Sequence, residues 1–438
     1  MPKSQEQEKP RAAEQTAPTT PEGAEQLRHS STSDVAELAD AEPRESMRFF
    51  PGFVQPYLTW ITGVPLKGGK QLIPWSPNRA GLLGLFQMAG GITLGAFALH
   101  PFTAWSIPLL VLGWLFTSGG MRRLDVVVVH QTLHRMFHKS ARVNRVVGEI
   151  ITTAFWRTPY DKNREEHLAH HAYPCSMKDS DTLYLLGTGM RPGMTRSQFR
   201  TYLWKALFSP RHHLLGFYGR VKGNFVGVKP RYRLVMSIVY AAATATFVAL
   251  TGWWLEWLLL WVFPVSYVFQ NCTFLYTMTE HRWWLFGNQE RLSRDKRDLL
   301  TFGRFCGEPV PDPSLSGVRK LGAWTHWTYR MLLVHSAYRM FVLVGDTVQH
   351  DLHHVMPACD WANSPWIRAD DQDNRPERYT EVWGSLADHL RAAGQVDGDR
   401  TGLPEDTEPT PWEESVPVLT GVVPAPAGSV SKAPGGTP

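Results

Sequence analysis

The sequence predicts an all-α membrane protein with four transmembrane helices in two hairpins and a cytosolic helical cap that carries three histidine-rich motifs, or histidine boxes. Three observations predict this class. The middle of the chain contains long apolar runs without a charged residue, basic residues lie on one side of these runs, and histidines recur at helical spacing. The average composition, with 43% hydrophobic and 19% charged residues, hides this pattern because two polar tails surround the apolar middle.

Both ends of the chain are predicted to be disordered tails. Residues 1–45 are rich in Glu, Gln, Ala, Pro, Thr and Ser, and residues 395–438 are rich in Gly, Pro, Asp, Glu and Thr. Such segments bury too little apolar surface to offset the loss of chain entropy on folding. The first residues also lack the basic start and apolar core of a secretory signal. A single membrane domain is therefore expected over residues 46–394.

Four apolar runs are the candidate membrane spans. Residues 81–99 and 103–120 form one pair, and residues 234–252 and 257–278 form a second pair. Each run approaches the roughly 20 helical residues that cross about 30 Å of hydrocarbon. Buried helices of a large soluble core are the alternative, but the Trp residues clustered at the ends of the runs favour membrane spans. The short separators within each pair predict two helical hairpins.

The distribution of basic residues predicts the orientation of these spans. The two hairpin tips contain no Lys or Arg. The segment between the hairpins begins with Arg122 and Arg123 and ends with Lys229, Arg231 and Arg233. Because short cytosolic loops retain Lys and Arg, this segment and both termini are expected on the cytosolic side of the cell membrane.

Histidines form three clusters at helical spacing. The clusters are His130 and His134, then His167, His170 and His171, and finally His350, His353 and His354. Residues three or four apart share a helix face, whereas adjacent residues diverge by about 100° and suit neighbouring metals. Eight imidazoles exceed the four ligands that a zinc ion usually takes, so the pattern predicts two metal ions. All three clusters lie on the predicted cytosolic side, where His281, just after the fourth run, is a ninth candidate.

Six further histidines are interpreted as ordinary surface or core residues, whereas His138 could extend the first cluster. The ordinary set comprises His100, His212, His213, His326, His335 and His389. The ring nitrogen that does not bind metal needs a partner to fix its tautomer. Candidate partners are Asp181, Glu280, Asp346 and Asp351, each of which could equally be a solvated or helix-capping carboxylate.

Cysteine content and net charge exclude several other classes. The four cysteines (Cys175, Cys272, Cys306 and Cys359) are far apart, without the spacing of a disulfide scaffold or an iron-sulfur site. The chain also lacks a Gly-rich nucleotide fingerprint between a strand and a helix. A net charge of +5 is too small to predict a nucleic-acid partner.

The ordered HxxxH, HxxHH and HxxHH motifs, placed between and after two hairpins, resemble the integral-membrane fatty acid desaturase and hydroxylase superfamily. The resemblance covers roughly residues 80–370. Flanking residues resemble the bacterial branch: Asn144, Arg145, Gly148, Glu149, residues 178–181, residues 280–282 and Pro357.

The resemblance implies a di-iron centre that uses O2 as co-substrate. The choice of iron rests on the resemblance, because imidazole ligands alone would also suit copper or zinc. Its implied ligands are His130, His134, His167, His170, His171, His350, His353 and His354, with His281 as the additional histidine near the last hairpin. The sequence departs from the family pattern at Gln131, where an acidic residue is common, and at residues 172–175. These departures affect the expected substrate and leave the metal set intact.

The resemblance also implies the reaction and the partners. The expected activity is the removal of two hydrogens from an unactivated carbon-carbon unit of a fatty acyl or lipid-like substrate. Hydroxylation of a lipid or a small metabolite on the same scaffold is the alternative. Electrons would come from an external carrier such as ferredoxin with its reductase. A metal or haem carrier is a remote alternative, because a carrier places polar ligands near the bilayer midplane and the predicted spans contain no histidine.

Overall fold

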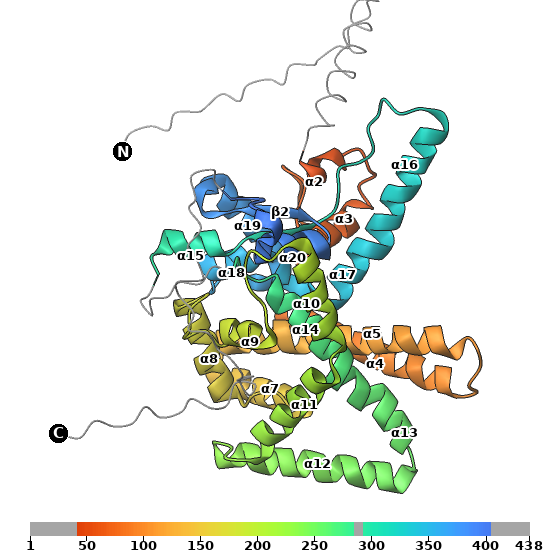
Figure 1. The fold of residues 1–438 in the computed structure, drawn as a ribbon, viewed down its shortest axis with the longest axis vertical. Helices are drawn as coiled ribbons and strands as arrows, with labels where there is room; N and C mark the ends of the chain where they lie inside the picture. Colours follow the sequence, from red (N-terminus) through yellow and green to blue (C-terminus); the bar gives the residue numbers. More distant parts are fainter. Residues whose placement is uncertain (1–41, 284–291, 404–438) are drawn as a thin grey trace, which may run out of the picture.

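The computed structural model describes residues 42–283 and 292–403, which are mostly helical (Figure 1). The long apolar helices and their continuations are α4 (Pro77–Leu99), α5 (Ser106–Arg122), α12 (Arg231–Thr251), α13 (Trp254–Trp257) and α14 (Phe269–Met278), with π-helical turns at Arg123–Val129, Leu258–Val262 and Pro264–Val268. The cap and its connections contain α6 (His130–Leu133), α7 (Ala141–Ala154), α8 (Tyr160–Ala172), α9 (Ser180–Thr188), α10 (Arg196–Phe208), α11 (Pro210–Phe225), α15 (Arg294–Leu300), α18 (His350–Val355), α19 (Ser364–Asn374) and α20 (Leu386–Gly394).

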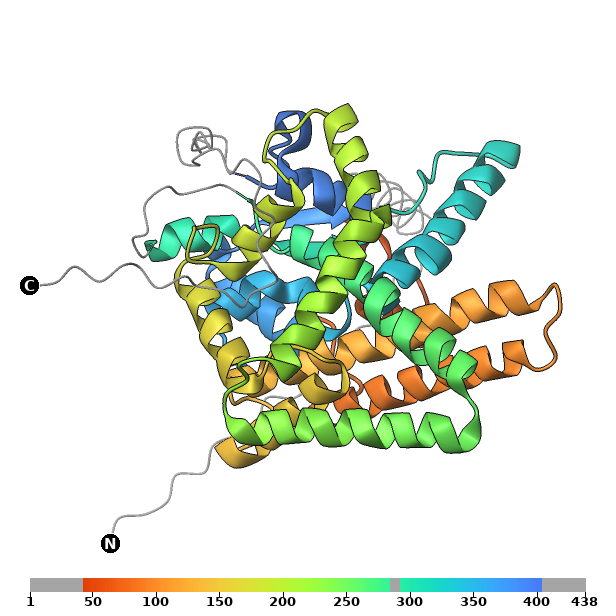
Figure 2. The same cartoon turned by 60° about the horizontal axis from the view of Figure 1, so that its bottom comes forward.

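The remaining helices border the cap. They are α2 (Pro43–Ser46), α3 (Gln55–Thr62), α16 (Gly317–Tyr329) and α17 (Ser336–Phe341), with a π-helical turn at Arg330–His335 and 3-10 turns at Gly345–Gln349, Trp361–Asn363, Pro376–Arg378 and Val396–Gly398. In Figures 1 and 2, the tip of the α4–α5 hairpin, the α12–α13 junction and the first residues of α16 extend to the same side of the molecule, away from the cap.

Three of the four predicted runs form candidate membrane spans. Among the described residues, Pro77–Leu99, Arg231–Thr251 and Trp254–Met278 are long and apolar enough to cross a membrane. The predicted span at residues 103–120 is helical, but α5 has only 17 residues, or about 26 Å of helix, and it already ends at Arg122. A further candidate, which the sequence did not predict because it contains charged residues, bends by 99° between Gly317–Phe341 and Gly345–Val355.

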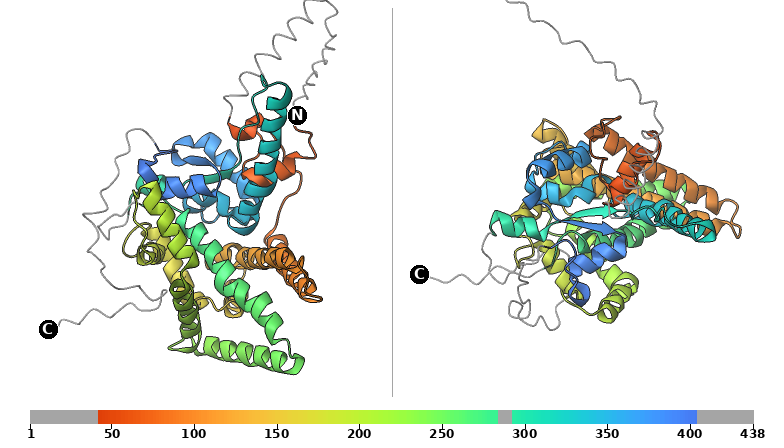
Figure 3. Two further views of the ribbon diagram at one scale, coloured as in Figure 1. Left: turned by 45° about the vertical axis from the view of Figure 1, so that its right-hand side comes forward. Right: turned by 90° about the horizontal axis from the view of Figure 1, so that it is seen from above.

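The all-α prediction is wrong in one detail, because two short strands pair inside the cap. Strands β1 (Gly303–Cys306) and β2 (Glu381–Gly384) form a parallel ladder in which Gly303 is opposite Glu381. Figure 3 shows this small sheet surrounded by helices. Strands of four residues carry too little alternation to be recognised in sequence. The pairing joins segments on either side of α16, α17, α18 and α19.

The described structure extends past both predicted tail boundaries. Arg44, predicted to be disordered, is buried and donates hydrogen bonds to the Val64 carbonyl and the side chains of Gln55 and Thr59. At the other end, Val396 is buried in the cap core. These contacts exist only in the folded chain, so local composition did not predict them. The rest of both predicted tails lies outside the described residues.

Close packing between α4 and α5 depends on glycine. A Cβ atom at Gly91 would lie 2.3 Å from the Thr117 amide nitrogen, and a Cβ atom at Gly113 would lie 2.9 Å from the Gly91 carbonyl oxygen. Gly91 and Gly95 form the small-xxx-small pattern that brings helices close together in membranes. Helix α12, by contrast, buries only 6% of its apolar window, although Arg233 near its start bonds Glu149 of α7 and Asn224 of α11.

Replacing Gly91 with Leu should separate α4 from α5 and lower the free energy of unfolding by roughly 1–3 kcal/mol, since a side chain there overlaps the facing backbone. Gly90 is the matched control, because a Cβ atom there meets nothing within 4 Å. Thermal unfolding of the purified protein in detergent measures both effects. Equal melting temperatures for the two leucine variants would contradict the packing described above.

Candidate metal centre

The nine histidines predicted from the sequence come together inside the cap. His130 begins α6 and His134 directly follows it, while α8 carries the second cluster and α18 carries the third. His281 lies just after α14 and forms an isolated bridge with Thr301. Segments separated by up to about 220 residues therefore deliver imidazoles to one place.

The nine rings divide into two adjacent groups, and within each group one nitrogen from every ring lies within 4.8 Å of the others. Group A contains His130, His134, His167, His171 and His353, and group B contains His170, His281, His350 and His354. Neighbours in sequence fall into different groups, because adjacent side chains on a helix diverge by about 100°. The His171 and His354 rings stack at 4.2 Å where the groups meet.

The Nε2 atoms within each group are at the spacing of metal ligands. In group A, the Nε2 atom of His167 lies 3.0 Å from that of His130, 2.6 Å from that of His134 and 3.1 Å from that of His171. In group B, the Nε2 atom of His281 lies 2.9 Å from that of His170 and 3.4 Å from that of His350. Two nitrogens bound at about 2.0–2.1 Å and at right angles to each other are separated by about 2.9 Å. Both groups therefore fit a first-row transition metal.

Burial keeps most of these imidazoles neutral, which is the form that binds a metal. Burial, followed by the charges of Arg164 and His170, lowers the pKa of His134 to about 4. The pKa values of His130, His167, His171 and His281 are lowered well below the ordinary value, again chiefly by burial.

His170 differs because a carboxylate lies behind it. Burial alone would lower the pKa of His170, but Asp179, whose Oδ1 atom is 3.0 Å from Nδ1, raises that pKa to about 10. The Asp179 side chain is fully buried and also accepts hydrogen bonds from the Cys175 amide and the Thr182 hydroxyl. Asp179 thus fixes the orientation of the His170 ring and directs Nε2 into group B.

Sequence reasoning missed Asp179 and proposed four other acids, which the structure places differently. Asp181 lies 3.7 Å from His170 Nδ1, farther away than Asp179. Asp346 accepts a hydrogen bond from Gln131 at 2.8 Å, and Asp351 pairs with Arg368 at 2.7 Å. Glu280 interacts with the Tyr276 hydroxyl. Asp179 and Asp181 are only two residues apart. The sequence therefore indicated the correct segment, but it did not show which of the two carboxylates contacts His170.

The remaining histidines of residues 42–283 and 292–403 lie outside both groups. His138 is exposed, and its Nδ1 atom accepts a hydrogen bond from the Ser140 amide. His100 contacts Glu256, His213 contacts the Leu207 carbonyl, and His389 contacts Tyr338 and the Val382 carbonyl. His335 lies 3.5 Å from Glu308, and His212 packs against Phe274. His326 is exposed.

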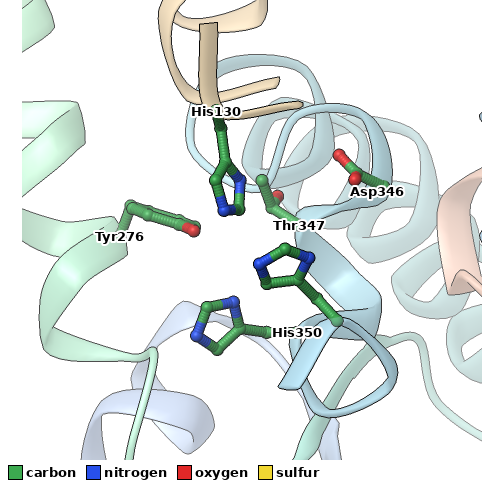
Figure 4. A pocket seen from close by; sticks show the side chains of 6 residues that line it. His130, Tyr276, Asp346, Thr347 and His350 are labelled. Atoms are coloured by element: carbon green, nitrogen blue, oxygen red, sulfur yellow. The ribbon is translucent and has the colours of Figure 1, made fainter. Parts of the chain in front are cut away.

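A narrow cavity adjoins the two groups. It is lined by His130 and His353 of group A, His350 of group B, and Tyr276, Asp346 and Thr347. Figure 4 shows the Tyr276 hydroxyl, delivered by α14, pointing into the space between His130 and His350. The cavity therefore combines imidazoles from both groups with one phenol.

Comparison with known proteins agrees with this geometry. A family model described as fatty acid desaturase matches residues 106–385, a region that covers more than half of the chain and includes all nine histidines. No curated protein sequence matches the chain significantly. Because the family match covers the histidine motifs in order and most of the described structure, the chain belongs to the fatty acid desaturase family.

Proposed function

We propose that this protein is an oxygen-dependent, non-haem di-iron membrane enzyme that desaturates a fatty acyl or lipid-like substrate. The observation that carries the proposal is the convergence of nine histidine Nε2 atoms in two adjacent groups, in a chain of the fatty acid desaturase family. Groups A and B would each hold one iron ion. When bound, the two ions would react with dioxygen and so supply the oxidising power needed to remove hydrogen from an unactivated C–H bond.

The residues of the chain position this centre and shield it. Asp179 orients His170, and the buried pair of Arg368 and Asp351 holds α18, which carries three of the histidines. Desaturation converts two adjacent CH2 groups, dioxygen, two electrons and two protons into an alkene and two water molecules. The four cysteines are far apart in sequence, without the spacing of an iron-sulfur site, so we propose an external carrier such as ferredoxin, with its reductase, as the electron source.

The substrate class follows from the setting of the centre. Three described helices are long and apolar enough to enter a bilayer, and α5 packs along α4 as the second arm of a hairpin. We therefore propose a multi-pass protein of the cell membrane whose centre faces the cytosol, the side on which the basic residues lie. An acyl chain held in the bilayer would reach the centre from the apolar side.

Hydroxylation is the second candidate reaction. Residues 172–175 depart from the family pattern, and they directly follow His170 and His171 in the folded cap. Hydroxylation consumes the same dioxygen, electrons and protons but yields one alcohol and one water molecule. A metal or haem carrier is less consistent with the histidine positions, because both groups lie in the cap and not along the apolar helices.

Product analysis separates these reactions. The iron-loaded protein, supplied with a reduced carrier, an acyl substrate and isotopically labelled dioxygen, should give an alkene without label, detected by mass spectrometry. A labelled alcohol would assign hydroxylation. If every acyl substrate tested remained unchanged, the acyl-chain proposal would be wrong.

Removing one histidine from either group should remove one metal. The His167→Ala and His281→Ala variants should each fall from two iron ions per chain to about one, since each ring is a central contact of its group. Elemental analysis of purified protein measures the ratio. His326→Ala, at an exposed position of α16, is the control and should keep both ions. Full iron content in both group variants would contradict the assignment.

Asp179→Asn should weaken iron binding by about 10- to 100-fold, because the His170 ring loses the carboxylate that orients it. Competition with a chelator gives the affinity. Asp161→Asn is the matched control, since Asp161 forms a surface ion pair with Arg145 away from both groups. An unchanged affinity in Asp179→Asn would show that the carboxylate does not support the centre.

A further inference from the structure

Tyr276 is a buried polar residue that the proposed ligand set does not use. It lies near the end of α14, and its side chain lines the cavity beside His130, His350 and His353. Figure 4 shows that its hydroxyl points toward the gap between the imidazoles of the two groups. A phenol in this position faces any small ligand that enters between groups A and B.

Two buried arginines hold the Tyr276 ring in place. The guanidinium groups of Arg122 and Arg304 lie 5.0 and 4.9 Å from the ring centre, within the range of cation–π contact. Each arginine is anchored in turn. Arg122 donates to the Thr273 hydroxyl and the Val342 carbonyl, and Arg304 donates to the Thr279 hydroxyl. The direction of the phenol hydroxyl is therefore set by the surrounding structure before a ligand arrives.

The other polar groups that line the cavity are poor hydrogen-bond donors to a ligand. The Thr347 hydroxyl donates to the Val344 carbonyl, and Asp346 accepts from Gln131. The imidazole Nε2 atoms face one another within the two groups. Glu280, one turn after Tyr276, is an alternative acceptor for the phenol hydrogen. A cavity ligand would therefore compete with Glu280 for the phenol hydrogen.

We propose that Tyr276 donates a hydrogen bond to the small oxygen- or nitrogen-donor ligand that binds between groups A and B. The inference rests on the proposed function, because it needs metal in both groups. It assigns Tyr276 the role of holding and orienting the ligand while the histidines bind the ions. A hydrogen bond to a ligand that carries negative charge is stronger than one between neutral groups.

Azide, a small anion that binds iron, is the probe for this hydrogen bond. Spectrophotometric titration of the iron-loaded, oxidised protein gives the dissociation constant for azide. Tyr276→Phe should raise that constant by about tenfold while keeping both iron ions. Tyr338→Phe is the matched control, because Tyr338 is also buried but bonds His389 outside the cavity lining. Its azide affinity should equal that of the unmodified protein.

An unchanged azide affinity in iron-replete Tyr276→Phe would overturn the inference. If that variant does not fold, the infrared stretch of azide bound to the unmodified protein decides the question. The band should shift between light and heavy water because the phenol hydrogen exchanges, and the absence of a shift would overturn the inference. Iron content is measured separately, so an unmodified protein without iron would refute the proposed function and not this hydrogen bond alone.

Discussion

The structure depends on one electrostatic constraint, the placement of nine imidazole nitrogens within reach of one another in a buried site. Neutral imidazoles that turn their Nε2 atoms toward each other at 2.6–3.4 Å cannot all be satisfied by hydrogen bonds among themselves, because each ring carries one N–H at most. A cation in each group removes this conflict. The rest of the cap can be understood as the means of holding the rings there.

Buried arginines provide much of that support. Arg368 pairs with Asp351 in α18, and Arg304 bonds the carbonyl of Thr347 just before the third histidine cluster. Breaking a buried ion pair by removing one partner typically costs about 3–5 kcal/mol, so such pairs restrain the helix that carries three imidazoles. Arg304 also contacts the Tyr276 ring. The same side chain thus links the histidine groups to the cavity beside them.

The apolar part and the cap meet at α14 and the π-helical continuation of α5. Helix α5 runs directly into Arg123–Val129 and then into His130, so the first histidine cluster is fixed by a helix packed along α4 through glycine. Helix α14 ends three residues before His281 and delivers Tyr276 on the way. Two apolar hairpins therefore set the positions of ligands from both groups, while α8 and α18 supply the others.

The sequence by itself determined what local pattern encodes. Three of the four apolar runs, the grouping of histidines on shared helix faces and the separation of His170 from His171 all follow from hydropathy and from the 3.6-residue helix period. Tertiary structure decided what depends on distant partners. The choice of Asp179 over Asp181, the pairing of β1 with β2, the packing of residues 42–45 and the placement of Tyr276 at the cavity all require segments that meet only on folding. Local periodicity contains no information about these long-range contacts, because they are fixed by packing in three dimensions.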